Sequence, residues 1–327
     1  MWGRFFLLGG LTMARLTNSH GIPLALALWA VDDDYDYNDD PSYISATSLL
    51  KPLREITLRP RVPFELKKVE DVADYLARAM GNSIHAGVEM AWTHRYVRNL
   101  RKLGYDEDTI AMVQINPPKP IPGTIPVYIE QRNVRELGKW KIGGKFDLCI
   151  EGVLHDTKTA STFKYRKGDT KDYMLQGSIY RWLHRDKITS DVIRICFVFT
   201  DWQAFRAKQD PDYPQTKVLS IDVPLMSIEE TETWILQRLS LIEQFSGVPE
   251  RQLPACTPEE LWVEPTQYKY YSDPMKTERA TKDFKTDKAG AYAYLASKGK
   301  GIVKEIVGTP KRCGYCSAFP ICTQRTT

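Results

Sequence analysis

The 327-residue sequence predicts an α/β fold, because helical and strand-like patterns alternate along the chain. Apolar residues recur at helical spacing in an early block and again in two later segments, and the segments between them read as strands. We expect helices at residues 45–53, 69–79, 81–102, 171–184 and 227–245. We expect strands at residues 127–132, 140–150, 153–158, 192–200 and 217–223, with Gly143, Gly144 and Gly152 as break signals. The almost continuous apolar run at 192–200 suits a central buried strand.

Local composition divides the chain into three predicted parts. Residues 1–42 form a loosely ordered, acidic N-terminal segment, because Asp32–Asp40 holds six acids in nine residues. Residues 43–250 carry the alternating helices and strands and form the predicted core. Residues 251–327 turn rich in Pro, Lys, Thr and Tyr and end in a cluster of cysteines, which predicts a C-terminal appendage held by its cysteines rather than by a large core.

Composition excludes several classes of protein. With 43% hydrophobic and 26% charged residues, the chain is neither disordered nor fibrous. Its longest apolar stretch, Ile22–Val31, is much shorter than the roughly 20 residues of a membrane-spanning helix. Residues 1–13 faintly resemble a secretory signal but lack a cleavage site, and translation from Met13 is the alternative. We therefore expect a cytoplasmic protein that does not enter a membrane.

Two aspartates are predicted to face each other across a hairpin. If Glu151 and Gly152 form a two-residue turn, paired positions sum to 303, so Asp147 faces Asp156 with their Cβ atoms roughly 5 Å apart. Opposed like charges destabilise a sheet, whereas one Mg²⁺ or Mn²⁺ between them converts repulsion into coordination. Lys158 shares the strand face of Asp156 and can reach a water or a phosphate oxygen there. The alternative is a solvent-facing pair neutralised by Lys145 and Lys158.

Two helices carry polar pairs at a spacing of four residues, which places each pair on one helix face. His85 and Glu89 form the first pair, upstream of the hairpin. Gln176 and Tyr180 form the second pair, downstream of it. Either pair alone is a weak signal, because a lone histidine is more often structural.

Taken in order, these motifs resemble the RecB-like branch of the PD-(D/E)XK nuclease superfamily. The matching patterns are Gly-x-x-x-His at 81–85, Gly-x-x-Asp at 144–147, Asp-x-Lys at 156–158 and Gln-x-x-x-Tyr at 176–180. The chain looks most similar to phage-encoded exonucleases and to CRISPR-associated RecB-like exonucleases. The resemblance implies a restriction-endonuclease-like core, in which a mixed central sheet is flanked by helices.

The resemblance also implies roles for individual residues. Asp147, Asp156, the Thr157 carbonyl and His85 would bind the catalytic Mg²⁺ or Mn²⁺, and Lys158 would orient and acidify the attacking water. Gln176 and Tyr180 would brace the site and contact nucleic acid. Glu89 matches less securely, as a metal ligand or as a support for its helix.

Three cysteines near the C-terminus have the spacing of metal ligands. Cys313, Cys316 and Cys322 are arranged as Cys-x2-Cys-x5-Cys, which is typical of zinc or iron–sulfur sites. A fourth ligand is needed. Cys149 and Cys196 lie in apolar strand segments and are expected to pack as small hydrophobes, so Cys256, in a loop-like segment, is the expected fourth ligand.

The same resemblance bears on this cluster. CRISPR-associated and AddB-like nucleases carry a [4Fe-4S] cluster on one early and three late cysteines, and the three late ones match here. Cys256 follows the nuclease motifs instead of preceding them, so Zn²⁺ is the alternative. Either metal would join Cys256 to the tail across 56 intervening residues and play a structural part.

The net charge of +4 hides three basic stretches around the predicted metal site. The first contains Arg95, Arg98 and Arg101 at helical spacing, and the second spans 132–145. The third contains Lys164, Arg166 and Lys167, with Phe163 or Tyr165 able to stack on an unpaired base. We therefore expect a DNA substrate, with single strands or frayed ends favoured.

The sequence thus predicts a metal-dependent DNA exonuclease, of phage type and serving recombination, replication or repair in the host cytoplasm, where a recombination protein could be its partner. Two alternatives stay open. One is a structure-specific endonuclease within a larger assembly. The other is a non-catalytic nucleic-acid-binding protein with a zinc module, against which the intact Asp147, Asp156 and Lys158 argue.

Overall fold

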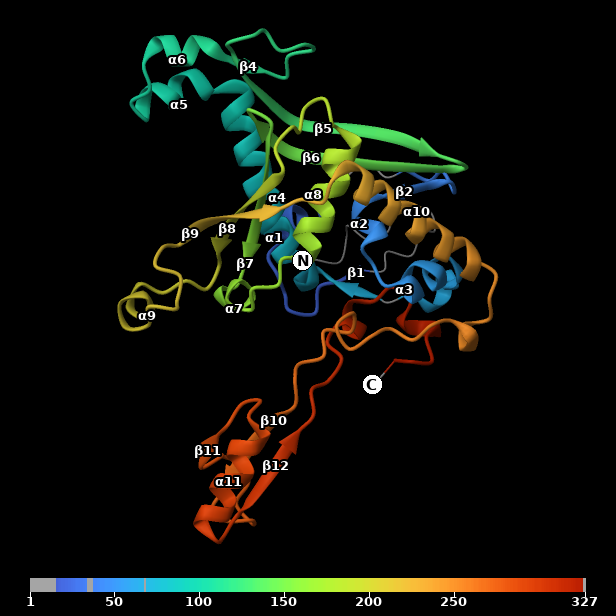
Figure 1. Ribbon diagram of the computed structural model, residues 1–327, viewed down its shortest axis with the longest axis vertical. Helices are drawn as coiled ribbons and strands as arrows, with labels where there is room; N and C mark the ends of the chain where they lie inside the picture. Colours follow the sequence, from blue (N-terminus) through green and yellow to red (C-terminus); the bar gives the residue numbers. More distant parts are fainter. Residues whose placement is uncertain (1–15, 34–37, 68, 326–327) are drawn as a thin grey trace, which may run out of the picture. The chain divides into compact units, whose positions relative to one another are not determined.

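A computed structural model of the protein describes residues 16–33, 38–67 and 69–325 (Figure 1). Residues 1–13, and with them the question of the start at Met13, lie outside the described residues, as does the centre of the acidic run at 34–37. The chain forms two compact units. The first contains residues 1–51 and 68–240, and the second contains residues 52–67 and 241–327. The predicted boundaries after residues 42 and 250 stay predictions.

A mixed β-sheet forms the centre of the first unit, which confirms the predicted α/β class. Its strands run in the order β4-β5-β6-β7-β8-β9, and β2 pairs with β6 as a branch. The β2–β6, β4–β5 and β7–β8 pairs are parallel, and the β5–β6, β6–β7 and β8–β9 pairs are antiparallel. The strands are β2 (Tyr43–Ser45), β4 (Val113–Ile115), β5 (Ile125–Leu137), β6 (Trp140–Ile150), β7 (Val153–Ala160), β8 (Val192–Phe199) and β9 (Val218–Pro224).

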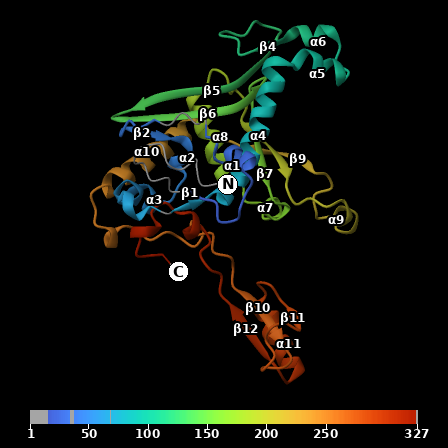
Figure 2. The ribbon, with the colours of Figure 1, turned by 180° about the vertical axis from the view of Figure 1, so that it is seen from behind.

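Helices accompany this sheet, as both ribbon views show (Figures 1 and 2). Helices α4 and α8 contact its strands, and α1 packs against α4. A short parallel pair of β1 (Leu16–Thr17) and β3 (Glu70–Asp71) precedes α4. The helices are α1 (Leu24–Val31), α2 (Ala46–Leu49), α4 (Val72–His94), α5 (Tyr96–Lys102), α6 (Glu107–Met112), α7 (Thr162–Arg166), α8 (Lys171–Leu183), α9 (Ala204–Gln209) and α10 (Ile228–Phe245).

Helix α4 is longer than the sequence pattern predicts. The predicted break between residues 79 and 81 is wrong, because the helix continues through Gly81 and ends at His94. At Gly81 a Cβ atom would lie 3.3 Å from the Thr159 side chain, so glycine allows close packing against β7. Asp71 caps the start of the helix, because its side chain accepts a hydrogen bond from the backbone N–H of Ala73, and Asp74 completes the capping box.

The predicted helix at 45–53 is also interrupted. Ser45 caps the short helix α2, accepting a hydrogen bond from the backbone N–H of Ser48 at 3.1 Å. Pro52 then adopts an extended conformation, and α3 (Leu53–Leu58) begins after it as part of the second unit. Proline disfavours helix at the residue before it, which explains the interruption.

Gly143 and Gly144 lie inside β6 and do not interrupt it. A Cβ atom at Gly143 would overlap the ring of Tyr43 at 2.3 Å, and one at Gly144 would lie 2.8 Å from the ring of Tyr180. The two glycines therefore allow β2 and α8 to pack closely against the strand. Strand β8 has the interior position expected of the 192–200 segment, although buried and half-buried residues alternate along it.

The second unit combines the residues that follow α10 with α3. Leu58, Leu253 and Ala318 form a small buried cluster there. A three-stranded antiparallel sheet in the order β11-β10-β12 carries one helix. These elements are β10 (Gln267–Tyr271), β11 (Lys282–Asp283), α11 (Lys288–Lys298) and β12 (Ile302–Ile306). Among the described residues, no helix is long and apolar enough to cross a membrane.

Candidate functional site

The hairpin between β6 and β7 has the predicted turn. Glu151 and Gly152 both have positive φ, 49° and 81°, as a two-residue hairpin turn of the mirror-image type requires. The strand pairs Ile150–Val153, Cys149–Leu154 and Leu148–His155 all sum to 303. Backbone pairing ends one position short of Asp147 and Asp156, and β7 continues alongside β8. The two aspartates thus stand where the pairing of β6 with β7 stops.

His85 from α4 meets Asp147 from β6. Their Nδ1 and Oδ2 atoms lie 3.0 Å apart. This contact raises the pKa of His85, although burial of the ring opposes the shift. Asp156 and Lys158 also act electrostatically on His85. The structure therefore brings four of the predicted site residues into one charged group.

Asp156 is buried and paired with Lys158. Asp156 is 5% exposed. Lys158 Nζ donates a hydrogen bond to Oδ1 at 2.9 Å and lies 2.8 Å from Oδ2. Within the described residues, Oδ2 accepts no hydrogen bond, and its contact with Lys158 is an ion pair. Burial raises the pKa of Asp156, Lys158 lowers it in part, and Asp147 raises it further. A cation at Oδ2 would offset the free-energy cost of burying the negative charge of Asp156.

Glu130 is a site residue that sequence reasoning missed. The pairs Ile129–Leu148 and Gln131–Phe146 place Glu130 opposite Asp147 on the neighbouring strand. Its φ is 51°, and its carboxylate is ion-paired with Lys145. Burial raises the pKa of Glu130, and Asp147 and Glu89 add to this effect. Lys145 therefore pairs with Glu130, not with either aspartate as the neutralised-pair alternative expects.

The register of β5 with β6 would have revealed Glu130 from the sequence. The two strands are joined through Gly138 and Lys139, and Leu137 pairs with Trp140. All their pairs sum to 277, which places position 130 opposite position 147. The sequence predicts a strand that ends at residue 132, five residues before the end of β5. The hairpin between β5 and β6 is therefore not evident from the sequence pattern.

Helix α8 carries Tyr173 and the predicted pair of Gln176 and Tyr180. Burial raises the pKa of Tyr173 to about 12, and Asp156 contributes to the shift, which places the two side chains within electrostatic reach. Tyr173 precedes Gln176 by three residues and so shares its helix face. Gln176 donates a hydrogen bond to the Tyr180 hydroxyl at 3.1 Å. The predicted Gln-x-x-x-Tyr pair is thus hydrogen-bonded within helix α8.

The basic residues have varied surroundings. Arg95 stands between α4 and α5 and Arg98 lies on α5, so the predicted arginines do not continue the helix of His85. Lys164 lies 5.7 Å above the Tyr173 ring, and Arg166 lies 3.4 Å from Asp210. The remaining predicted contact, Lys167, is exposed at the end of α7.

Only one of the two proposed stacking rings is available to a base. Tyr165 packs edge-to-face against Phe197 and Phe199, with both ring centroids 5.5 Å away. Phe163 is 66% exposed.

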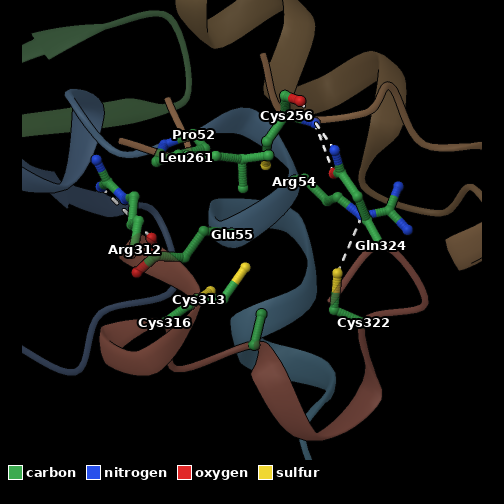
Figure 3. Close-up of a pocket in the computed structure, with 11 residues that line it drawn as sticks. Pro52, Arg54, Glu55, Cys256, Leu261, Arg312, Cys313, Cys316, Cys322 and Gln324 are labelled. Carbon is green, nitrogen blue, oxygen red and sulfur yellow. Dashed lines mark hydrogen bonds and ion pairs between the residues drawn. The ribbon is translucent and has the colours of Figure 1, made fainter. Parts of the chain in front are cut away.

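In the second unit, four cysteines line one pocket (Figure 3). Cys256 lies on one side of it, and Cys313, Cys316 and Cys322 lie on the other. The pocket holds about 370 Å³ of empty space, part of it open to solvent. Burial raises the pKa of Cys256 to about 12 and that of Cys316 above its ordinary value. Burial therefore favours the neutral thiol at Cys256 and Cys316.

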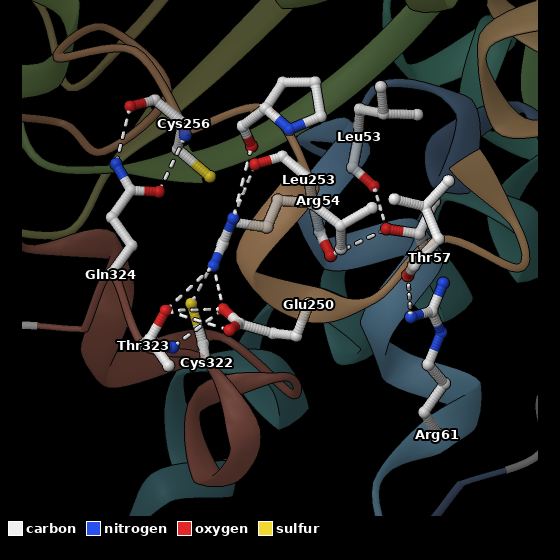
Figure 4. Close-up of polar contacts among 12 residues, drawn as sticks. Leu53, Arg54, Thr57, Arg61, Glu250, Leu253, Cys256, Cys322, Thr323 and Gln324 are labelled. Carbon is white, nitrogen blue, oxygen red and sulfur yellow. Dashed lines mark hydrogen bonds and ion pairs between the residues drawn. The ribbon is translucent and has the colours of Figure 1, made fainter. Parts of the chain in front are cut away.

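Arg54 of α3 links the segments that carry these cysteines (Figure 4). It donates hydrogen bonds to Cys322 Sγ at 3.2 Å and to the Leu253 carbonyl at 3.0 Å, and it is ion-paired with Glu250. Gln324 bonds both backbone groups of Cys256, at 2.7 and 2.8 Å. The Cys256 loop and the C-terminal tail are thus held together by hydrogen bonds in this structure.

Neither cluster has its side chains gathered around an ion. Across residues 16–33, 38–67 and 69–325, no group of three or more His, Cys, Asp and Glu side chains is close enough together to hold a metal. Lys158 supplies positive charge beside Asp156, and His85 contacts Asp147. The donor chemistry still suits a metal in each place, since hard oxygens favour Mg²⁺ or Mn²⁺ and thiolates favour zinc or iron.

Comparisons with known proteins give no family for this chain. No family model matches it, and no curated protein matches it. Among solved structures, the crystal structure of SSO0001 has a TM-score of 0.42 and 12% identity, over 70% of this chain and 96% of the other. A phage-related exonuclease from Haemophilus somnus 129PT has a TM-score of 0.28 and 16% identity, over 62% and 93%. Likeness at these scores carries no argument about function.

Proposed function

We propose that the chain is a nuclease that hydrolyses phosphodiester bonds of DNA with Mg²⁺ or Mn²⁺. The observation that carries the proposal is the group of His85, Asp147, Asp156 and Lys158, in which a buried carboxylate oxygen accepts no hydrogen bond from the described residues. A purely structural ion pair would not require a second carboxylate, Asp147, near the buried Asp156, because neighbouring like charges cost free energy unless a cation offsets them.

Each residue has a distinct part in this proposal. Asp147, Asp156, His85 and the Thr157 carbonyl would hold the cation, which would supply charge stabilisation at the scissile phosphate. Lys158, already 2.9 Å from Asp156 Oδ1, would orient the attacking water and offset negative charge that develops on the phosphate oxygens. Gln176 and Tyr180 would brace this side of the site. Glu130 would hold Lys145 beside Asp147.

The finer proposal is an exonuclease of phage type that serves recombination, replication or repair in the cytoplasm. The order of the four sequence motifs supports it. Exposed Phe163 with Lys164, Arg166 and Lys167 on the segment after β7 favours a single-stranded or frayed DNA end, since an aromatic ring can stack on an unpaired base. An endonuclease within a larger assembly and a non-catalytic DNA-binding protein are the alternatives.

Digestion of end-labelled linear DNA with Mg²⁺ or Mn²⁺ tests the activity. Wild-type protein should release labelled nucleotides, and separate 5′ and 3′ labels give the polarity. Circular DNA of the same sequence separates the two nuclease alternatives, because an exonuclease leaves it intact. Equal digestion by wild type and Asp156→Ala would sink the nuclease proposal.

We also propose a [4Fe-4S] cluster on Cys256, Cys313, Cys316 and Cys322, with Zn²⁺ as the alternative. All four residues line one pocket, and Arg54 donates to Cys322 Sγ. Positive charge beside the sulfur atoms favours an anionic cluster, and hydrogen bonds to sulfur are typical of such sites. The bound group would fasten the Cys256 loop to the tail.

Anaerobic purification distinguishes the two metals. A cluster gives a brown protein that contains iron and acid-labile sulfide, whereas a zinc site gives a colourless protein with one zinc per chain. Cys313→Ser should lose the metal, and Cys196→Ser, which changes a half-buried cysteine of β8, should keep it. Metal retained at wild-type level by Cys313→Ser would refute the site.

A further inference from the structure

The connection between β8 and β9 is much longer than an antiparallel strand pair needs. Hairpin loops usually have two to five residues, whereas residues 200–217 connect these two strands. Hydrogen bonds fix the shape of this segment, which we call the β8–β9 loop. Trp202 Nε1 donates to the Pro214 carbonyl at 2.8 Å, and the backbone N–H of Gln203 donates to the hydroxyl of the buried Tyr213 at 3.0 Å. Long loops with a defined structure are usually functional.

The β8–β9 loop is attached to α7 at two places. Because β7 and β8 are parallel, α7 and the loop leave the sheet at the same end, where both ribbon views show α7 and α9 (Figures 1 and 2). Asp201 accepts hydrogen bonds from the backbone N–H and the hydroxyl of Thr162, at 2.7 and 3.2 Å. Further along the loop, Asp210 lies 3.4 Å from Arg166. We call this joined structure, residues 162–167 and 200–210, the α7–α9 platform.

The platform lies on the same face of the sheet as the proposed metal site. Tyr165 of α7 packs on Phe197 of β8, and Phe197 pairs with Lys158. Directly opposed residues share a face, and so do residues two apart on one strand, which adds Asp156 to this face. Asp156 stands four residues before Ala160, the end of β7, a distance of about 13 Å. About four stacked nucleotides of one strand, at roughly 3.4 Å each, would span that distance.

Two phenylalanine rings of the platform are exposed. Phe163 of α7 is 66% exposed, and Phe205 of α9 is 70% exposed. Rings that bury so little area contribute little to the stability of the fold, but each offers a flat surface on which an unpaired base can stack. The two short helices also contain four basic residues and no acidic residue, and the basic ones are Lys164, Arg166, Arg206 and Lys208.

The positive charge of the platform is balanced in part. Arg166 is paired with Asp210, and Asp201 is engaged by Thr162. Arg206 and Lys208 are exposed, and within the part of the chain that the structure describes neither forms an ion pair. The remaining acid of the loop, Asp212, lies beyond α9 in a turn. Helix α9 therefore presents two cations on either side of an exposed ring's sequence neighbours.

We infer that the α7–α9 platform binds the unpaired end of a DNA strand beside the cut, with α9 as the half that the sequence does not reveal. The identity of the ligand rests on the proposed nuclease function. Phe163 and Phe205 would each stack on a base, and Arg206 and Lys208 would contact phosphates. Because both rings need unpaired bases, the substrate class is a single strand or a duplex with a single-stranded overhang.

Binding without divalent metal tests the inference independently of cleavage. Fluorescence anisotropy of the full chain in EDTA gives its affinity for a labelled single strand and for a blunt duplex of the same sequence. Phe205→Ala should weaken single-strand binding about tenfold, since one stacked base is lost, and should leave duplex binding unchanged. Arg206→Gln/Lys208→Gln should make the slope of log affinity against log salt shallower by about 1.4, at about 0.7 per lost phosphate contact.

Matched controls change the same residue types in the second unit. Phe64→Ala removes a ring that is 59% exposed, and Lys285→Gln/Lys298→Gln removes two exposed cations. Neither should change single-strand affinity or its salt dependence. All these side chains are exposed, so each variant should melt at the temperature of wild type, which excludes misfolding as the cause of weak binding.

Digestion of the same DNA with Mg²⁺ separates failure of this inference from failure of the proposed function. If wild type cleaves DNA but Phe205→Ala binds single strands as wild type does, the platform is refuted and the nuclease proposal stands. If wild type binds single strands through Phe205 but cleaves no DNA, the platform stands and the nuclease proposal fails. An equal loss of affinity in Phe64→Ala, or no binding of single strands by wild type, would overturn the inference.

Discussion

In the carboxylate site of the first unit Asp147 and Asp156 each contact a basic side chain, whereas in the cysteine pocket of the second unit burial favours the neutral thiols of Cys256 and Cys316. His85 meets Asp147 and Lys158 meets Asp156. In the pocket, burial raises the pKa of both thiols, and Arg54 contacts Cys322 as a hydrogen-bond donor.

The difference follows from the elements that carry the two sites. A hairpin and a long helix fix the carboxylates, so their repulsion has to be balanced in the fold itself. The late cysteines lie in or directly after short 3₁₀ turns at Arg312–Tyr315 and Phe319–Ile321, and these segments pack against a small cluster of Leu58, Leu253 and Ala318. We therefore expect substitutions in the first site to change chemistry more than stability, and those around the pocket to change stability more.

Asp156→Asn should cause the largest loss of activity in the first site. Cleavage of end-labelled DNA should fall by about 10³-fold or more, since a metal-binding charge is lost. The free energy of unfolding, measured in urea, should stay level or rise, because burial already disfavours the charge on Asp156. Asp212→Asn, on an exposed loop, is the control and should change neither quantity. A large loss of stability would mean that Asp156 is chiefly structural.

Arg54→Gln should give the opposite pattern in the second unit. The side chain is 6% exposed, and removing its charge leaves Glu250 without this cationic partner and the Leu253 carbonyl without this donor. Loss of one member of a buried ion pair costs about 3–5 kcal/mol. Urea unfolding gives this value, and hydrogen exchange over residues 250–325 should locate it. The exposed Arg59→Gln is the control, and equal losses in the two variants would contradict the role assigned to Arg54.

The sequence predicts short-range geometry well in this chain. The turn at Glu151–Gly152 and its register depend on adjacent residues, so arithmetic on positions located the hairpin correctly. Strand 140–150 is reproduced residue for residue. The sequence predicts a helix break near Gly81 because glycine is a weak helix former in isolation. In the structure α4 continues through Gly81, where the missing side chain allows close packing against β7.

Tertiary contacts explain what the sequence could not predict. Arg54 reaches Cys322 across 268 positions, and no local pattern connects α3 with the tail. Glu130 was missed for a smaller reason, because β5 extends beyond its apolar part into the polar segment up to Leu137. The four cysteines were grouped by spacing and by elimination, and the structure places them around one pocket. Whether they bind iron or zinc stays a prediction.

His184 should make the first unit sensitive to acid independently of the proposed metal site. It is 1% exposed, and its ring packs edge-to-face on Phe146 at 4.7 Å. Burial lowers its pKa to about 4 from 6.5, with a weaker opposing effect of the Gly144 backbone. Unfolding therefore takes up a proton between these values, and the free energy of unfolding should fall by up to about 3 kcal/mol as pH drops from 6.5 to 4.

Urea unfolding at several pH values measures this contribution of His184. His184→Gln should flatten the slope in that window, and His20→Gln, at an exposed ring, should not. If wild type and His184→Gln lose stability in parallel, the histidine has no such role.

Glu130→Gln gives the smallest expected effect and sharpens the boundary of the carboxylate site. The substitution keeps the shape of the side chain but removes the charge that is ion-paired with Lys145 and lies near Asp147. A residue that supports metal ligands typically contributes about tenfold to metal affinity, so Mn²⁺ should bind about tenfold more weakly in calorimetry. Glu136→Gln changes an exposed glutamate of the same strand, opposite Lys141, and should bind Mn²⁺ as wild type does. Equal Mn²⁺ affinity in all three proteins would exclude Glu130 from the site and confine it to His85, Asp147 and Asp156.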